Sequence, residues 1–131
     1  MLVDSSVLID VLLRDKKWFE RSAAALAAAG DDGELVINPI IFAEVSVRYR
    51  SVEDLNKVLP TSLYRREELP YEAAFLAGRA FVKYRRHGGS RTSPMPDFYI
   101  GAHAEVSGFR VLTRDPRRFR RYFPTVELIA P

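Results

Sequence analysis

MLVDSSVLID, residues 1–10, contains the clearest structural signal in the chain. A short apolar run at residues 2–3 ends at Asp4, and apolar residues then recur at helical spacing as Val7, Leu8, Val11 and Leu12. This pattern predicts a buried strand, a carboxylate at its carboxyl end, and a helix that starts there. Ligands of open parallel α/β sheets bind at the carboxyl ends of the strands. Asp4 is therefore either the N-cap of the helix or the first member of a site.

The composition is that of a globular domain. A chain of 131 residues can bury one core and is too short for two, and its 47% hydrophobic and 28% charged residues are ordinary values. Cysteine is absent, which excludes disulfides and thiolate metal sites and suits a reducing compartment. Neither a membrane span nor a signal-peptide pattern is present. We therefore expect one domain over residues 1–131, located in the cytoplasm and away from membranes.

Arginine dominates the positive charge. The net charge is only +3, but 16 of the 20 basic residues are arginine, which binds phosphate through two nitrogens and stacks on bases. The charge is concentrated in residues 83–91 and 110–121. These stretches are either solvated surface or a footprint for nucleic acid, and net charge alone does not separate the two.

Strands and helices alternate along the rest of the chain. The predicted strands after the first cover residues 35–37, 62–65, 110–113 and 126–129. The predicted helices cover residues 18–29, 39–49, 51–59, 70–86, 97–107 and 115–122, with residues 65–68 as a solvated turn. Asn38-Pro39 and Asp115-Pro116 have the pattern of an N-cap followed by proline. The alternation predicts an α/β fold with a largely parallel sheet flanked by helices on both faces.

Glu44 is the one acid in a helix that is apolar on nearly all sides. Such a helix is normally buried, and burying an isolated carboxylate costs several kcal/mol unless it is paired or binds a metal. An ion pair with Arg48 or Arg50 is the structural explanation, and a role in a site is the functional one.

Three more acids occupy positions that the fold brings to one edge. Asp4 and Asp115 directly follow strands, and Asp97 begins the helix before the fourth strand. Each could serve only at a helix N-terminus, where the dipole favours an acid. Right-handed crossovers, however, place residues that follow parallel strands on the same edge of the sheet. Their joint occurrence, with Glu44 unexplained by capping, favours a site.

Clustered carboxylates repel one another, and a divalent cation would relieve the repulsion. Oxygen ligands suit Mg²⁺ or Mn²⁺. A carboxylate-bound cation can activate water for attack on a phosphodiester and stabilise the leaving oxygen. We expect the basic stretches to hold the substrate backbone through Arg86, Arg91, Arg114, Arg117 and Arg118. The residues therefore predict a metal-dependent phosphodiesterase acting on nucleic acid.

Four segments resemble the successive motifs of the PIN domain, and most closely those of the VapC toxins of toxin–antitoxin pairs. These segments are residues 2–10, 42–45, 96–104 and 112–119, and the resemblance extends over essentially the whole chain. It implies that the metal-binding, catalytic acids are Asp4, Glu44, Asp97 and Asp115, supported by Ser6 and Thr113.

The resemblance further implies a PIN-like sheet of five strands with the first strand central. It implies an endoribonuclease that uses Mg²⁺, with Mn²⁺ as a substitute, and acts on RNA, with transfer RNA among the candidates. The implied partners are a VapB-type antitoxin and a second copy of the chain. Some relatives carry another acid in the helix that starts at Asp97, where this chain has Ile100, Gly101 and His103, so the coordination number stays open.

Two other functions are compatible with acids on a parallel sheet. A phosphoacceptor signalling domain commonly uses a lysine after a late strand, and no lysine follows Lys83 here. A non-catalytic module that binds RNA or a partner on the same fold is the alternative to the nuclease. Among the remaining residues, we expect His103 to be a surface or packed side chain, and Asp10 to form a surface pair with Arg14 four residues later.

Overall fold

Five short parallel strands form the sheet at the centre of the molecule. The computed structural model describes residues 1–131, and the strand order is β3-β2-β1-β4-β5. The strands are β1 (Leu2–Val3), β2 (Leu35–Ile37), β3 (Tyr64–Arg66), β4 (Val111–Leu112) and β5 (Leu128–Ile129). The predicted five-stranded sheet with the first strand central is confirmed. The carboxyl ends of parallel strands meet at one edge, so the residues after β1 and β4 are neighbours there.

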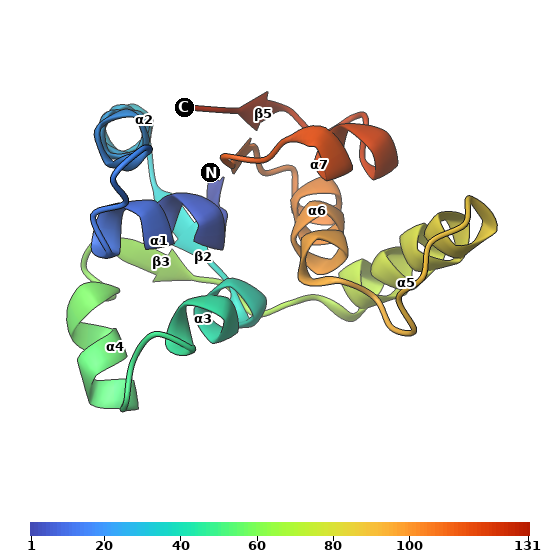
Figure 1. Cartoon of the computed structure of the whole chain (residues 1–131), viewed down its shortest axis with the longest axis horizontal. Helices are drawn as coiled ribbons and strands as arrows, with labels where there is room; N and C mark the ends of the chain where they lie inside the picture. The colour runs from blue at the N-terminus through green and yellow to red at the C-terminus, as the bar shows by residue number, and fades with distance from the viewer.

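Seven helices cover the sheet. They are α1 (Ser5–Leu12), α2 (Phe19–Asp32), α3 (Pro39–Ser46), α4 (Val52–Val58), α5 (Tyr71–Arg86), α6 (Pro96–Ser107) and α7 (Arg117–Tyr122). The chain moves from β1 to β2 and β3, and then crosses back to β4 and β5 on the other side of β1. Right-handed connections therefore place α1–α4 on one face and α5–α7 on the other. Figure 1 shows α5 and the loop after it reaching away from the sheet (the α5 arm, residues 71–95).

Apolar side chains from the strands and from both helical layers form one continuous core. The strands β1, β2 and β4 are fully buried, as expected of central parallel strands. On the second face, α5 packs against α6 through small buried side chains: Ala73, Ala77 and Ala80. Gly101 in α6 is required by a close contact, because a Cβ atom there would collide with the ring of Phe123. These contacts anchor α6, and hence the carboxylate at its N-terminus, against the sheet.

The structure corrects two predictions near the sheet edge. The helix predicted over residues 39–49 ends at Ser46, and it is not buried all round, because Ala43 is exposed and Val47 beyond it is 75% exposed. The strand predicted over residues 62–65 begins two residues later, at Tyr64, and continues to Arg66 in place of the turn predicted over residues 65–68. The side chains of Arg65 and Arg66 are exposed, as an edge strand allows.

Two helix ends also differ from the prediction. The helix α2 continues through Gly30 and ends at Asp32, with Gly33 as its C-cap. Asp115 is not the N-cap of α7, because the helix begins one residue later than expected, after Pro116, and no side chain caps it. By contrast, the predicted cap at Asn38 is confirmed, because its Oδ1 accepts a hydrogen bond from the backbone N–H of Ile41. None of the helices has both the length and the apolar character needed to cross a membrane.

Candidate active site

Asp4 stands at the end of the central strand and is 4% exposed. It occupies the N-cap position of α1, yet its side chain makes no capping hydrogen bond. Its Oδ2 instead accepts hydrogen bonds from Ser6 Oγ and Thr113 Oγ1, both at 2.8 Å. Its Oδ1 is buried and has no partner. A buried acceptor without a donor is costly, so the arrangement leaves one carboxylate oxygen available to a ligand.

Ser6 and Thr113 each connect Asp4 to the loop after β4. The hydroxyl oxygen of Ser6 accepts a hydrogen bond from the backbone N–H of Arg114, with N and O 3.1 Å apart. The hydroxyl oxygen of Thr113 accepts one from the backbone N–H of Asp115, also at 3.1 Å. Each hydroxyl thus donates to Asp4 and accepts from the loop. This arrangement fixes the rotamer of Asp4 and the path of the segment that carries Asp115.

Glu44 is half-buried in α3 and its Oε1 accepts a hydrogen bond from Ser5 Oγ at 2.9 Å. The pairing with Arg48 or Arg50 considered from the sequence is wrong, because neither arginine forms an ion pair with Glu44. Burial raises the pKa of Glu44 to about 7, with Ser5 opposing and the charges of Asp4 and Asp97 adding to the rise. Ser5 is a residue of the site that no sequence motif indicated, and its only signal is its place beside Asp4.

Asp97 lies in the first turn of α6, and its Oδ2 accepts a hydrogen bond from Arg118 Nη1 at 3.0 Å. Burial raises its pKa, Arg118 lowers it, and the charge of Asp115 raises it further. Asp115 is the most exposed of these acids, with its side chain 61% exposed. The hydrogen bond that Arg117 Nε donates to its Oδ1 at 3.2 Å lowers the pKa of Asp115.

The predicted acids thus share one electrostatic environment. The pKa of Asp4 is raised first by burial and then by the charge of Asp97. Asp4, Glu44 and Asp97 therefore hold negative charge at a cost in the absence of a cation. As they lie, no three acidic or histidine side chains enclose a metal-ion position. The donor set nevertheless fits a hard divalent cation, because Asp4 offers a buried, unpartnered oxygen beside carboxylates whose ionisation is disfavoured.

The raised pKa of Glu44 predicts a pH-dependent stability in the chain without added metal. The folded-state pKa is about 7 against 4.5 for the free side chain, so the folded state binds the proton more tightly. The contribution of protonated Glu44 to the free energy of unfolding is therefore fully present below pH 4.5, and it is lost as the pH rises through about 7. Glu44→Gln is expected to melt at a higher temperature than the wild type at pH 8, with the difference shrinking towards pH 4.5.

Thermal unfolding in EDTA across this pH range measures the effect. Glu68→Gln, an exposed site in the loop before α5, is the matched control and is expected to show no such trend. A constant difference between Glu44→Gln and the wild type at all pH values would contradict the prediction.

Asp10 is buried rather than on the surface, so its predicted pair with Arg14 was wrong. It is 1% exposed, its Oδ2 accepts a hydrogen bond from Ser22 Oγ at 2.8 Å, and Arg114 Nε lies 2.9 Å from the same oxygen. The guanidinium of Arg114 also lies over the ring of Trp18, 5.4 Å from its centroid. Asp10 therefore ties α1 and α2 to the loop after β4.

His103 is packed and not part of the acidic site. It is 1% exposed, and its Nδ1 lies 3.0 Å from Asn38 Nδ2. Since the amide nitrogen can only donate, Nδ1 accepts and the ring is neutral, in line with a pKa that burial lowers. The ring meets Phe109 edge to face. One of the two alternatives expected for His103, a packed side chain, is therefore observed.

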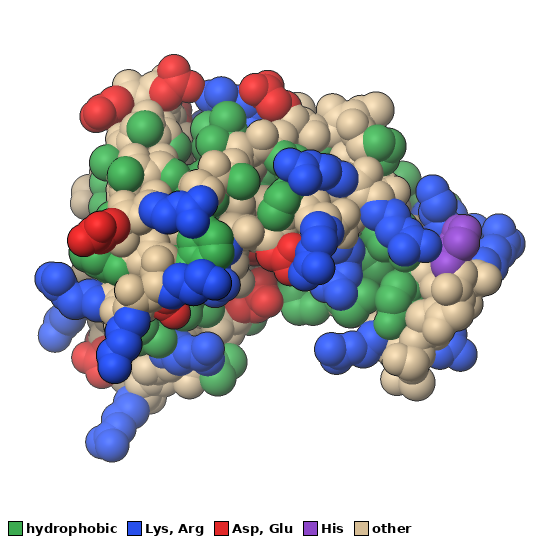
Figure 2. Space-filling view, turned by 45° about the horizontal axis from the view of Figure 1, so that its top comes forward, with side chains coloured by type: hydrophobic (Ala, Val, Ile, Leu, Met, Phe, Trp, Pro, Cys, Tyr) green, Lys and Arg blue, Asp and Glu red, His purple; other side chains and the backbone are tan.

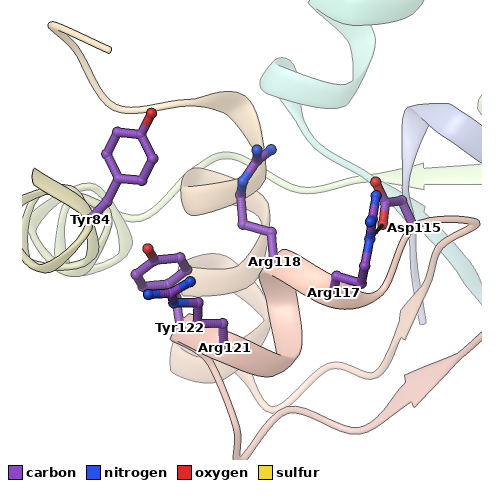
Figure 3. Close-up of a pocket in the computed structure, with 6 residues that line it drawn as sticks. All are labelled: Tyr84, Asp115, Arg117, Arg118, Arg121 and Tyr122. Carbon is purple, nitrogen blue, oxygen red and sulfur yellow. Dashed lines mark hydrogen bonds and ion pairs between the residues drawn. The ribbon is translucent and has the colours of Figure 1, made fainter. Parts of the chain in front are cut away.

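The predicted RNA-binding arginines fall into three places. Arg86 and Arg91 are exposed on the α5 arm, and Arg114 is engaged by Asp10. Arg117 and Arg118 line a pocket of about 370 Å³ beside Asp115 (Figure 3). Figure 2 shows acidic side chains gathered at the edge of the hollow beside the α5 arm, with Lys and Arg side chains spread around them. An anionic strand approaching this face would meet positive charge before it reached the acids.

Comparison with solved structures shows the same fold over the full length of the chain. VapBC2 from Rickettsia felis bound to a DNA fragment from their promoter gives a TM-score of 0.71 at 15% identity, covering 99% of this chain and 97% of that one. VapBC-1 from nontypeable Haemophilus influenzae gives 0.72 at 14% identity, covering 98% and 96%. A toxin–antitoxin complex from Klebsiella pneumoniae gives 0.68 at 20% identity, covering 90% and 88%.

The family assignment comes from the sequence. No curated protein matches the chain. The sequence profile of the PIN domain, however, matches residues 1–123, which include every strand except β5 and every acid of the candidate site. This match, on a chain whose fold and length agree with the solved neighbours, identifies the chain as a member of the PIN domain family.

Proposed function

We propose that the chain is a metal-dependent endoribonuclease and the toxin component of a VapBC-type pair. The observation that carries the proposal is the set of carboxylates at the carboxyl edge of the sheet, in which Asp4 presents a buried and unpartnered Oδ1. Membership of the PIN family, whose domains are typically nucleases, and the arginines that contact Asp97 and Asp115 support it. The VapBC-type neighbours support the toxin assignment.

We assign the cation, Mg²⁺ with Mn²⁺ as a substitute, to Asp4 and Asp97, with Glu44 and Asp115 completing the acidic set. When bound, it supplies activation of water and neutralisation of charge on the phosphate. The residues of the chain do the positioning. Ser6 and Thr113 hold Asp4 in one rotamer.

The arginines next to the acids are suited to the substrate phosphates. In the structure Arg118 donates a hydrogen bond to Asp97, and Arg117 donates one to Asp115. With a cation held by these carboxylates, Arg117 and Arg118 would each be free to bind phosphate oxygens through two nitrogens. The basic side chains of the α5 arm, Arg86 and Arg91, would then grip the backbone farther along the strand.

Metal removal is the direct test of this proposal. The purified chain is incubated with total cellular RNA in Mn²⁺, in Mg²⁺ and in EDTA, together with Asp97→Asn and the control Glu105→Gln. Both acids lie on α6, but Glu105 is exposed and away from the acidic set. We expect discrete fragments with either metal and none in EDTA or with Asp97→Asn, while Glu105→Gln cleaves like the wild type. Intact RNA in every lane would contradict the nuclease, and retained RNA binding would then indicate the non-catalytic module.

We also propose a small antitoxin of VapB type as the partner, and a homodimer as the assembly. The antitoxin is supported by the neighbours, which were solved as VapBC or toxin–antitoxin complexes. The homodimer rests on the family resemblance alone. Co-expression with a short reading frame next to this gene, followed by affinity purification and light scattering, tests both. A complex that suppresses RNA cleavage is expected. A chain that elutes as a monomer and co-purifies with nothing would contradict this part of the proposal.

A further inference from the structure

The pocket beside the acids has aromatic as well as basic walls. Its lining comes from α5, α7 and the loop before α7: Tyr84, Asp115, Arg117, Arg118, Arg121 and Tyr122. Figure 3 shows the two tyrosines and Arg121 on one side, Asp115 and Arg117 on the other, and Arg118 between them. The pocket is therefore continuous with the acidic site, because Asp115 belongs to both and Arg118 contacts Asp97.

Both tyrosine rings are held in place before any ligand binds. The buried ring of Phe98 meets Tyr84 and Tyr122 edge to face, with centroids 5.8 and 5.0 Å apart. The hydroxyl oxygen of Tyr84 accepts hydrogen bonds from the backbone N–H groups of Ser90 and Arg91, at 3.2 and 3.3 Å. These contacts fix the rings, so a ligand that stacks on them does not have to order them first.

Arg121 is the pocket arginine that no carboxylate neutralises. Arg117 and Arg118 are paired with Asp115 and Asp97, whereas Arg121 makes no ion pair. Its guanidinium carbon lies 5.6 Å from the centroid of the Tyr122 ring. A guanidinium group that lies over a half-buried aromatic ring and has no carboxylate partner offers charge for a phosphate and its own flat face for a base.

We propose that this pocket binds one unpaired nucleotide of single-stranded RNA next to the scissile phosphate. Its base stacks on the tyrosine side and its phosphate pairs with Arg121. The volume of about 370 Å³ is within the range of pockets that hold small molecules. In a duplex the bases stack on one another and cannot reach the rings, so single strands are preferred. The proposal rests on the nuclease function and adds a base-binding subsite beside its acids.

An acidic peptide is the other anion that three arginines could attract. It would use the guanidinium groups but gain nothing from two fixed aromatic rings, whereas every base has a face that stacks. The rings, together with continuity with the acids, favour the nucleotide. Poly-glutamate serves as the peptide probe in the test.

Binding is measured in EDTA, which separates it from cleavage, with a fluorescent single-stranded oligoadenylate and a duplex of the same length. Arg121→Gln is compared with Arg120→Gln, the adjacent exposed arginine of α7, which lies outside the pocket and makes no ion pair. Tyr122→Leu is compared with Tyr71→Leu, which is 94% exposed on α5, and with Tyr122→Phe, which keeps the ring.

We expect Arg121→Gln and Tyr122→Leu to weaken binding of the single strand by about tenfold or more. Tyr122→Phe, Arg120→Gln and Tyr71→Leu are expected to stay within about twofold of the wild type, because each keeps the ring or removes a group outside the pocket. The duplex is expected to bind more weakly than the single strand, with no selective loss in the pocket variants.

Equal losses in Arg121→Gln and Arg120→Gln would overturn the proposal, because they would reflect general charge. Selective loss of poly-glutamate binding with oligoadenylate unaffected would overturn it in favour of a peptide. If the wild type cleaves RNA and neither pocket variant loses affinity, the nuclease stands and the pocket fails. If RNA is never cleaved but Arg121→Gln and Tyr122→Leu selectively weaken binding of the single strand, the proposed pocket is supported and the proposed nuclease function is contradicted.

Discussion

Asp4→Asn is expected to lower metal-dependent RNA cleavage by at least about 100-fold, because mutation of the groups that merely support a metal ligand already costs about 10–100-fold. The asparagine is nearly isosteric, and its carbonyl oxygen can still accept from Ser6 and Thr113, so the local structure is retained. The substitution removes the negative charge of the carboxylate, whose Oδ1 is buried and has no partner. Initial rates of RNA cleavage in Mn²⁺, beside thermal unfolding in EDTA, measure the effect.

The unfolding measurement separates chemistry from folding. In EDTA the variant is expected to be at least as stable as the wild type, because burial and the charge of Asp97 disfavour ionised Asp4. Asp31→Asn, an exposed site in α2, is the matched control and should change neither cleavage nor stability. Cleavage within a few-fold of the wild type would remove Asp4 from the catalytic set.

Arg114→Met is expected to destabilise the fold by about 2–3 kcal/mol, because it leaves the carboxylate of Asp10 buried with only Ser22 as partner. We expect less than the ~3–5 kcal/mol of a fully enclosed pair, because the Arg114 side chain is 36% exposed. Methionine keeps apolar contact with Trp18, so the change removes mainly charge. Urea-induced unfolding at neutral pH measures it.

A double-mutant cycle identifies the cause. Asp10→Asn combined with Arg114→Met is expected to recover most of the lost stability, since no buried charge then lacks a partner. Arg120→Met, on the exposed side of α7, should have little effect. A double variant no more stable than Arg114→Met would show that the arginine stabilises through Trp18 rather than through Asp10.

The general architecture could be predicted because its signals are local. The apolar run at residues 2–3 and the helical periodicity after Asp4 follow from strand and helix geometry, and β2 coincides with its prediction at residues 35–37. The cap at Asn38 was recognisable because capping depends on the next three residues.

The errors share a physical origin. Asp10 and Arg14 are at the spacing of a surface pair, but α2 covers Asp10 and the loop after β4 brings Arg114 to it. Arg66 was assigned to a turn with its charged neighbours, but pairing with Ile37 of β2 makes it the last residue of an edge strand. Such long-range contacts leave no periodicity in the sequence.

The sequence alone determined the parallel α/β class, the PIN family motifs, and the identity of the acids that follow β1 and β4 or begin α6. These properties depend on residue type and on spacing along the chain. The tertiary structure decided which groups donate hydrogen bonds to the acids of the site. Ser5 donates to Glu44, Ser6 and Thr113 donate to Asp4, and Arg118 donates to Asp97. It also decided that Tyr84 and Tyr122 share a pocket with Arg121. These partners lie on different elements, and packing of α5, α6 and α7 on one face of the sheet is what brings the pocket together.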